Sequence, residues 1–390
     1  MKQVRTIQNG TLMTPFEAIP RGVVVFRDGK IVAVGRAAEV KIPKEATVID
    51  ASGRIVAPGL IDIHVHGAKG RDIMEASYEV INELAVFLSH HGTTSFLPTT
   101  VSAPQSALLD VIRAIRTAMK KGTDGAEVLG VHLEGSYISP QRSGAQDPGF
   151  IRLPSLDEFN EIWEASEGTV KIVTLAPEIK GADKLIAKLQ SLGIVASVGH
   201  SNATYSEMEK AIKYGVQHVS HTFNAMRGFH HREPGVVGAV LVRDELTAEL
   251  ICDNVHVHPA AAKLLVKAKG SGKVVLVTDA IHPTGMPDGK YKMGGRGVTV
   301  TNGVCRFESR ELAGSTLTMN KAVRNVMKSV GIPLQTAIRM GTINPAVVAN
   351  VDQRKGSLEP GKDADIVITD DDVNVFMTIV KGKLVYRRDL

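Results

Sequence analysis

The chain has 390 residues, a length typical of two or three domains or of one large barrel with an accessory module. Its composition, 43% apolar and 22% charged, excludes disordered and fibrous proteins. The formal net charge of +5, with Lys and Arg scattered among Asp and Glu, permits an anionic small substrate but argues against a nucleic-acid partner. Thirteen histidines against two cysteines are the unusual feature.

The start of the chain and the two cysteines bear on its compartment. Residues 1–4 lack the apolar segment of an export signal, and no apolar run approaches the ~20 residues that cross a bilayer. Cys252 and Cys305 belong to no Cys-x-x-Cys pair, so neither a disulfide framework nor a thiolate zinc site is expected. We therefore expect a soluble cytoplasmic protein with no membrane partner.

Both ends of the chain have the pattern of β-strands. Short β-branched runs at 22–26 and 30–34 flank the turn residues Asp28 and Gly29, and similar runs occupy 365–369, 375–380 and 384–386. This pattern predicts one small β-sandwich domain built from residues 1–52 together with 355–390. Two independent β appendages are the alternative.

The middle of the chain, residues 53–354, alternates short apolar runs with amphipathic helical stretches. Ser155 and Thr204 each begin a capping box, with glutamate three residues later. Eight strand-like runs over about 300 residues predict an α/β fold, a (β/α)8 TIM barrel that forms the catalytic domain. An open doubly wound sheet is the structural alternative. The runs are 55–63, 94–98, 128–133, 170–176, 194–198, 218–221, 248–251 and 274–277.

Histidines and carboxylates gather where these predicted strands end, the face on which barrel enzymes build their active sites. Side chains alternate along a strand, so His64 and His66 point to the same side. Imidazoles and carboxylates together form a nitrogen and oxygen site for one or two divalent metals, with room for a bound water. The candidate metal ligands are His64, His66, Glu134, His200, His221 and Asp279.

Other polar residues have a simpler interpretation. We expect the pairs 90–91 and 230–231 to be surface or helix-end histidines, and His132 to be structural or to support the metal ligands. Asp253 and Asp279 each follow a strand, so either is also a candidate helix N-cap.

Two long stretches carry a resemblance to a known family. The segment Val56-Ala-Pro-Gly-Leu-Ile-Asp-Ile-His-Val-His-Gly67 resembles the opening motif of the amidohydrolase superfamily, and residues 356–367 resemble the strand that returns to its β domain. Within that superfamily, further stretches resemble the deacetylases of N-acetylglucosamine 6-phosphate, over residues 5–385. These stretches are 132–135, 220–226, 232–235 and 312–319.

The resemblance implies an enzyme that hydrolyses the acetamide of N-acetyl-D-glucosamine 6-phosphate to D-glucosamine 6-phosphate and acetate, in amino-sugar catabolism and cell-wall sugar recycling. It implies one metal on Glu134, His200 and His221 and a second through His64 and His66, with Zn²⁺ or Fe²⁺ the expected ions and Mn²⁺ or Co²⁺ as alternatives. Asp279 matches the catalytic acid/base. A homodimer or homotetramer is expected. The implied substrate contacts are Ala145, Gln146, Asn224, Ala225, Arg232 (phosphate), His256, Leu312, Ala313 and Gly314.

The sequence departs from the family pattern at two positions, and two other functions compete. Ser136 stands where the family usually has proline, and Gln146 where some members have histidine.

One competing function is hydrolysis of cyclic amides, which in many relatives uses a carboxylated lysine at the end of strand four. Here Lys171 lies at the beginning of that strand. The other is a non-catalytic sugar-phosphate sensor or scaffold.

Overall fold

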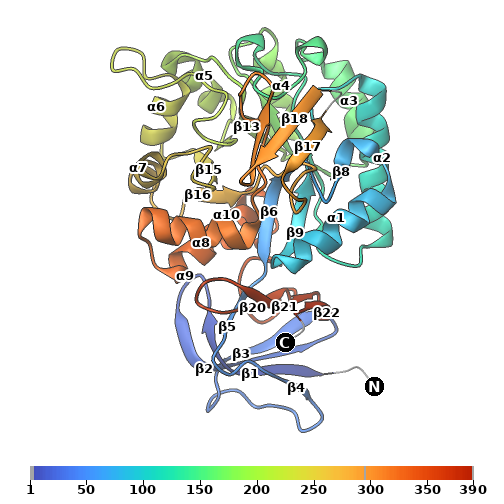
Figure 1. Cartoon of the computed structure of the whole chain (residues 1–390), viewed down its shortest axis with the longest axis vertical. Helices are drawn as coiled ribbons and strands as arrows, with labels where there is room; N and C mark the ends of the chain where they lie inside the picture. Colours follow the sequence, from blue (N-terminus) through green and yellow to red (C-terminus); the bar gives the residue numbers. More distant parts are fainter. Residues whose placement is uncertain (1–3, 294–295, 389–390) are drawn as a thin grey trace.

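The computed structural model describes residues 4–293 and 296–388, so the outermost residues of the predicted β domain, 1–3 and 389–390, lie outside it. Figure 1 shows an upper part, in which helices surround parallel strands, and a lower part of strands near both ends of the chain. Of the helices in the described ranges, none is both long and apolar enough to cross a membrane.

The lower part is one sheet of eight strands that joins the two ends of the chain. The strand order is β22-β21-β20-β5-β1-β2-β3, with β4 beside β1, and β5 pairs antiparallel with β20. The ends therefore share a single sheet instead of forming two appendages. Its strands are β1 (Arg5–Met13), β2 (Ala18–Arg27), β3 (Lys30–Arg36), β4 (Thr47–Asp50), β5 (Ile55–Pro58), β20 (Ile366–Thr369), β21 (Val375–Val380) and β22 (Lys383–Arg387).

The chain passes from the lower to the upper part at Gly59. The predicted strand 55–63 is in fact two strands: β5 in the lower sheet and β6 (Leu60–Val65) in the upper part. A Cβ at Gly59 would lie 2.2 Å from Thr94 Oγ1, so glycine lets the backbone pass this close to the Thr94 side chain. The predicted boundary at residue 52 therefore falls before β5, which pairs with the terminal strands.

The upper part is a TIM-barrel-like mixed α/β domain. Its parallel strands form two sheets, β10-β9-β6 and β11-β12-β13-β14-β15-β16, and parallel bridges Thr99–His132 and Val65–Ala280 join them. In the described residues these strands follow one another in chain order, without the reversal that marks a doubly wound sheet. They are β6, β9 (Thr93–Pro98), β10 (Glu127–Val128), β11 (Val131–Leu133), β12 (Val170–Leu175), β13 (Val195–Val198), β14 (His218–Val219), β15 (Thr247–Ile251) and β16 (Val274–Val277).

Helices connect the parallel strands and cover them with apolar faces. Thr204 begins its helix with a reciprocal capping box to Glu207, as its sequence predicts, and the Ser155 side chain accepts from Glu158 N. The helices are α1 (Tyr78–His90), α2 (Gln105–Lys121), α3 (Leu156–Ala165), α4 (Ala182–Ser191), α5 (Tyr205–Tyr214), α6 (Gly235–Val242), α7 (Pro259–Lys269), α8 (Met319–Val330), α9 (Leu334–Met340) and α10 (Ile343–Val348).

Small sheets lie outside the parallel strands. A three-stranded antiparallel sheet of β17 (Gly289–Met293), β18 (Arg296–Thr301) and β19 (Val304–Phe307) lies across the front of the upper part in Figure 1. Asn302 and Gly303, both at positive φ, make its second turn, as this dipeptide favours. A two-stranded ribbon of β7 (Gly67–Ala68) and β8 (Arg71–Asp72) follows β6 directly.

A buried cluster of charges holds the upper and lower parts together. Lys355 is fully buried, and its Nζ lies 2.6 Å from a carboxylate oxygen of Glu127 on β10. The same ammonium lies 3.2 Å from Asp363 and also contacts Asp365, just before β20. Arg354 adds further bonds to Glu127 and Asp363, so cations already hold this group of carboxylates.

We expect Lys355→Met to destabilise the protein by about 3–5 kcal/mol, because a charge removed from a buried ion pair leaves its partner uncompensated. The free energy of unfolding, measured by urea denaturation, checks this. Lys383→Ala is the control, since Lys383 is exposed and lies 3.9 Å from Asp124, and its effect should stay within about 0.5 kcal/mol. Equal effects of the two substitutions would contradict the structural role of Lys355.

Candidate metal centre

The six predicted metal ligands meet at the carboxyl ends of the parallel strands. His64 lies in β6 and His66 directly after it, while the other four follow β11, β13, β14 and β16. All are buried except Asp279, whose side chain is 15% exposed. The alternation along β6 brings both of its imidazoles to this site, as the sequence predicts.

Glu134 is the centre of the group. Its Oε1 lies 3.1 Å from His221 Nε2, 3.4 Å from His64 Nε2 and 3.5 Å from His200 Nε2. Its Oε2 lies 3.4 Å from His66 Nε2. One carboxylate therefore faces all four imidazoles, each through the same ring nitrogen.

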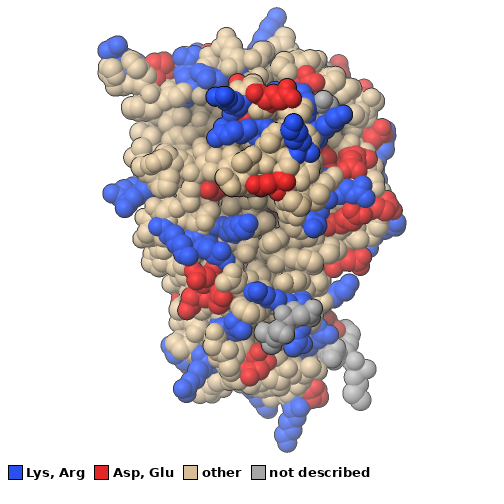
Figure 2. Space-filling model, in the orientation of Figure 1, with Lys and Arg blue, Asp and Glu red and all other residues tan. Residues whose placement is uncertain are grey.

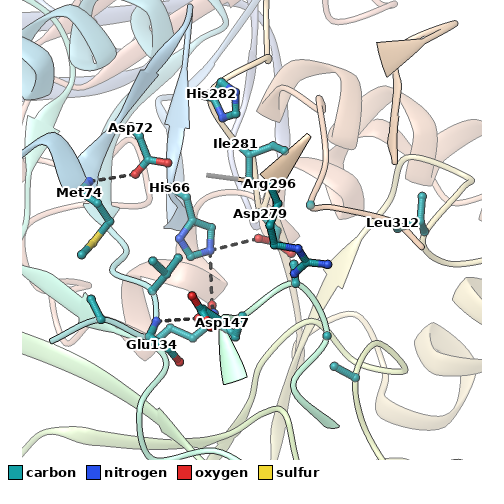
Figure 3. A pocket seen from close by; sticks show the side chains of 18 of the residues that line it. His66, Asp72, Met74, Glu134, Asp147, Asp279, Ile281, His282, Arg296 and Leu312 are labelled. Atoms are coloured by element: carbon teal, nitrogen blue, oxygen red, sulfur yellow. Dashed lines mark hydrogen bonds and ion pairs between the residues drawn. The ribbon is translucent and has the colours of Figure 1, made fainter. Parts of the chain in front are cut away.

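Asp279 completes the group on the side of His66. Its Oδ1 lies 3.3 Å from His66 Nε2 and 3.8 Å from His64 Nε2. In Figure 3, dashed lines connect His66 with both Asp279 and Glu134. Burial disfavours the imidazolium form of His66, but the two carboxylates outweigh burial and raise the pKa of His66 to about 9.

The electrostatics of Glu134 show how strongly this group attracts positive charge. Burial opposes its ionisation, yet the charge of His64 and hydrogen bonding from His200 and His221 hold the pKa of Glu134 well below its usual range. A divalent cation would satisfy the same demand for positive charge without protonating the imidazoles.

The donor set fits a divalent metal. Nδ1 of His66 donates to the Thr99 carbonyl at 3.0 Å, and Nδ1 of His200 donates to the Arg142 carbonyl at 2.9 Å, which directs the Nε2 lone pairs inward. His64 Nε2 is buried and has no hydrogen-bond partner among the described residues. His200 Nε2 and His221 Nε2 face each other at 3.1 Å. Two mixed groups lie close enough to share an ion: His64, His66 and Asp279, and Glu134, His200 and His221.

The backbone is strained where it presents these side chains. His200, His221 and Asp279 have φ of +48°, +28° and +49°, in a region that non-glycine residues rarely adopt. Such strain persists only where the surrounding structure imposes it, and it is concentrated at functional sites.

A cavity of about 630 Å³ opens onto the metal centre. Most of the substrate contacts implied by the resemblance line it: Ala145, Gln146, Asn224, Ala225, His256, Leu312 and Gly314. Two are not among its described lining residues. Ala313 is buried in a small apolar cluster with Ile281, and Arg232 is exposed, with Nη1 2.8 Å from His231 Nε2.

The two residues that depart from the family pattern, Gln146 and Ser136, both lie near the site. Gln146 Nε2 donates to Glu134 Oε2 at 2.9 Å and Gln146 Oε1 accepts from Ser102 N, so the glutamine holds the central carboxylate. Ser136 is buried at φ +61° and its backbone N donates to Ser102 Oγ. Neither departure displaces the metal ligands.

His132 and Asp253 take structural positions. His132 bonds to Ile63 O and Thr174 Oγ1 through its two ring nitrogens, which leaves neither for a metal. Asp253 caps a turn, accepting from the backbone N of Val255 and His256, and its Oδ2 lies 2.6 Å from His256 Nδ1. Neither it nor Asp279 is a helix N-cap, since the N-cap of α7 is His258 and that of α8 is Thr318.

Sequence analysis missed several residues at the site. Glu249, within β15, contacts His64, His218 and His221. A glutamate inside an otherwise apolar run was the available signal. Asp72, His282, Lys292 and Arg296 line the cavity, the last two from the small antiparallel sheet, whose folding back over the site no local pattern indicates.

The profile of the amidohydrolase family matches residues 55–385. The chain belongs to this family. Over 389 residues it is 38% identical to N-acetylglucosamine-6-phosphate deacetylase of Bacillus subtilis (strain 168), covering 99% of this chain and 98% of the relative. It is 39% identical to N-acetylgalactosamine-6-phosphate deacetylase of Escherichia coli O157:H7, with 88% and 90% covered. The resemblance seen in the motifs is thus confirmed.

Solved structures of the amidohydrolase family give the same result. The N-acetyl-D-glucosamine-6-phosphate deacetylase of Mycobacterium smegmatis, a mutant in complex with N-acetyl-D-glucosamine-6-phosphate, superposes with a TM-score of 0.91 at 33% identity and covers 98% and 99% of the two chains. The enzyme of Pasteurella multocida gives a TM-score of 0.93 at 31% identity, with 99% and 100% covered. An enamidase at 17% identity, with a TM-score of 0.67, shares the fold.

We expect Zn²⁺ to raise the Tm of the metal-free protein and to have much less effect on Glu134→Gln, which removes the charge that all four imidazoles face. A ligand present at 100 times its Kd stabilises the folded state by about 2.7 kcal/mol. Thermal unfolding with and without the ion measures the difference, and Glu161→Gln at an exposed position of α3 is the control. An equal rise in Tm for Glu134→Gln would contradict this site.

Proposed function

We propose that the protein hydrolyses the acetamide of N-acetyl-D-glucosamine 6-phosphate to D-glucosamine 6-phosphate and acetate, in amino-sugar catabolism and cell-wall sugar recycling. The observation that carries the proposal is a set of candidate metal ligands with Asp279 beside His66, at a cavity of about 630 Å³. The 38% identity to a deacetylase of this substrate over 99% of the chain supports it.

The metal centre would hold one or two divalent ions, Zn²⁺ or Fe²⁺ first, with Mn²⁺ or Co²⁺ also compatible with imidazole and carboxylate ligands. Glu134, His200 and His221 would hold one ion, and His64 and His66 the other, with Glu134 shared and Asp279 beside them. When bound, such an ion polarises the amide carbonyl and lowers the pKa of water.

Asp279 moves the proton in this proposal. Burial opposes ionisation of Asp279, but hydrogen bonding from His66 and the charge of His64 keep its pKa below the usual value, so the side chain is ionised at neutral pH, the form in which it can accept a proton. It takes the proton from the water whose oxygen attacks the carbonyl carbon. It then returns the proton to the amide nitrogen, the C–N bond breaks, and acetate and the free amine leave.

The cavity wall orients the sugar phosphate. Asn224, Ala225 and His256 line the same cavity as Asp279, and Asp253 holds the His256 ring through Nδ1, which directs Nε2 away from that carboxylate. Ala145, Gln146, Leu312 and Gly314 contribute further contacts, and Ala313 supports that wall from behind. Arg232 lies outside this cavity, so we propose that it reaches a phosphate only in a homodimer or homotetramer. A cytoplasmic location remains a prediction.

The proposal extends to the architecture of the two parts of the chain. We propose that the upper part closes as a (β/α)8 barrel and that the lower part forms a β sandwich. The ranges predicted from the sequence, 53–354 for the barrel and 1–52 with 355–390 for the sandwich, then change at one point: β5 joins the sandwich. The bridge from β6 to the end of β16 supports closure. The apolar cluster of the lower sheet, which includes Leu12, Phe26 and Ile366, supports a sandwich core.

A second candidate substrate is the epimer N-acetylgalactosamine 6-phosphate, because a relative of 39% identity is named for it. Hydrolysis of cyclic amides has less support, since Lys171 at the beginning of β12 does not line the cavity in the described residues, and Glu134 would be the carboxylate that two ions share. A scaffold would have no need for Asp279 beside an intact ligand set.

We expect the metal-loaded protein to release acetate from N-acetylglucosamine 6-phosphate with a higher kcat/KM than from the galactosamine and mannosamine epimers. Coupled acetate detection with Zn²⁺, Fe²⁺ and Mn²⁺ in turn measures this. Faster hydrolysis of the galactosamine epimer would favour the second candidate, and no acetate from any epimer would overturn the deacetylase proposal.

We expect Asp279→Asn to lower kcat by about 10²–10⁴-fold with KM changed only a few-fold, because the amide keeps the shape of the side chain but cannot accept the proton. Steady-state kinetics checks this, with Asp183→Asn at an exposed position of α4 as the matched control. Near-normal kcat in Asp279→Asn would rule out this role.

A further inference from the structure

Glu249 is a buried charge in the middle of β15 that the mechanism above does not use. It is fully buried, as are its strand neighbours Ala248, Leu250 and Ile251. A carboxylate in such surroundings is costly unless hydrogen bonds and opposite charge compensate for lost water. The position therefore calls for an explanation through its partners.

Among the described residues, the hydrogen-bond partners of the Glu249 side chain are His64, His218 and His221. Its Oε2 accepts from His64 Nδ1 at 2.8 Å and from the backbone N of His221 at 2.9 Å. Its Oε1 lies 3.1 Å from His218 Nε2. One carboxylate thus contacts a residue from each of the two candidate metal groups without reaching into the cavity.

His64 differs in this respect from the other imidazoles at the site. His66 and His200 donate their Nδ1 hydrogens to backbone carbonyls, and His221 Nδ1 has no partner among the described residues. Within that part of the chain, His64 is the ligand oriented by a carboxylate. A charged acceptor on one ring nitrogen fixes the tautomer and makes the other nitrogen a better donor to a metal.

A second buried histidine, His218, lies against Glu249. Thr247 donates its hydroxyl hydrogen to the Gln217 carbonyl, so its oxygen is left to accept from His218 Nδ1 at 2.6 Å. The other nitrogen of His218 faces Glu249. The buried His218 ring therefore connects Glu249 to the Thr247 hydroxyl and holds the carboxylate in place.

We infer that Glu249 is a positioning residue that holds His64 Nε2 toward Glu134 and Asp279 and thereby sets the affinity of the metal position shared by His64 and His66. The inference rests on the proposed metal-dependent function. Through the backbone of His221, the same carboxylate also holds the strained turn after β14.

Glu249→Gln tests the charge with little change in shape, because glutamine can still accept from His64 and His221. We expect His64→Gln to lose one ion. Glu249→Gln should bind that same ion 10–100-fold more weakly than the wild type does. Metal content by inductively coupled plasma mass spectrometry and competition with a chelator measure the affinity. The second readout is kinetic: excess metal should restore the kcat of Glu249→Gln, and its KM should be unchanged. Wild-type affinity in Glu249→Gln would overturn the inference, as would a His64→Gln variant that loses no ion.

Three further proteins separate positioning from general damage. Glu127→Gln, a carboxylate substitution in the distant Lys355 cluster, should change stability but not metal content. In the double variant with His64→Gln, Glu249→Gln should cost no additional metal, and a further loss would contradict action through His64. Should Glu249→Gln not fold, Glu249→Asp keeps the charge beside His218 but shortens its reach. It should lose the same ion, and wild-type affinity would overturn the inference.

These measurements also distinguish the two levels of the account. Loss of the ion in Glu249→Gln without acetate release by the metal-loaded wild type would uphold the positioning role and refute the deacetylase. Acetate release by the metal-loaded wild type, with unchanged metal binding in Glu249→Gln, would uphold the deacetylase and refute the positioning role.

Discussion

The convergence of four imidazoles on one buried carboxylate, Glu134, is the interaction on which the rest of the site depends. Unpaired, such a charge would be unfavourable away from water, and the imidazoles compensate for it only when they are protonated or share a cation. The pKa of Glu134 is held low and that of His66 raised to about 9 by this mutual attraction. Strand ends bring these residues together, since they are far apart in sequence.

The barrel-like arrangement of strands holds the imidazoles in place around Glu134. Each ligand follows a different buried strand, apart from the pair on β6, and backbone groups or Glu249 fix the rings from outside. Strained φ angles at His200, His221 and Asp279 indicate that presentation of the ligands overrides local backbone preference. The Lys355 cluster performs the corresponding task between the two parts of the chain, where charges far apart in sequence are buried together. Figure 2 shows that on the surface it draws, by contrast, acidic and basic side chains are interspersed.

Much of this organisation could be predicted from sequence because it depends on local patterns. Alternation along a strand placed His64 and His66 together, and the position of Glu134, His200 and His221 after apolar runs placed them at one face. The predicted boundary falls before β5 because residues 55–63 have the mostly apolar pattern of one strand, although Gly59 within them marks the crossing between two sheets. The role of Glu249 could not be predicted, because the residues that it contacts come from other strands. The apolar pattern of its own strand indicates that the position is buried but not which residues lie against it. Arg232 was assigned through resemblance, and its exposure outside the cavity depends on tertiary folding.

The most direct test of the account is anomalous diffraction from crystals of the protein loaded with Zn²⁺ or Fe²⁺. The account predicts an anomalous peak within bonding distance of the Glu134 carboxylate and of the Nε2 atoms of His200 and His221. With full loading, it predicts a second peak bounded by His64, His66 and Glu134. A fully loaded crystal with no peak beside Glu134, or with the metal bound only elsewhere, would contradict the central claim.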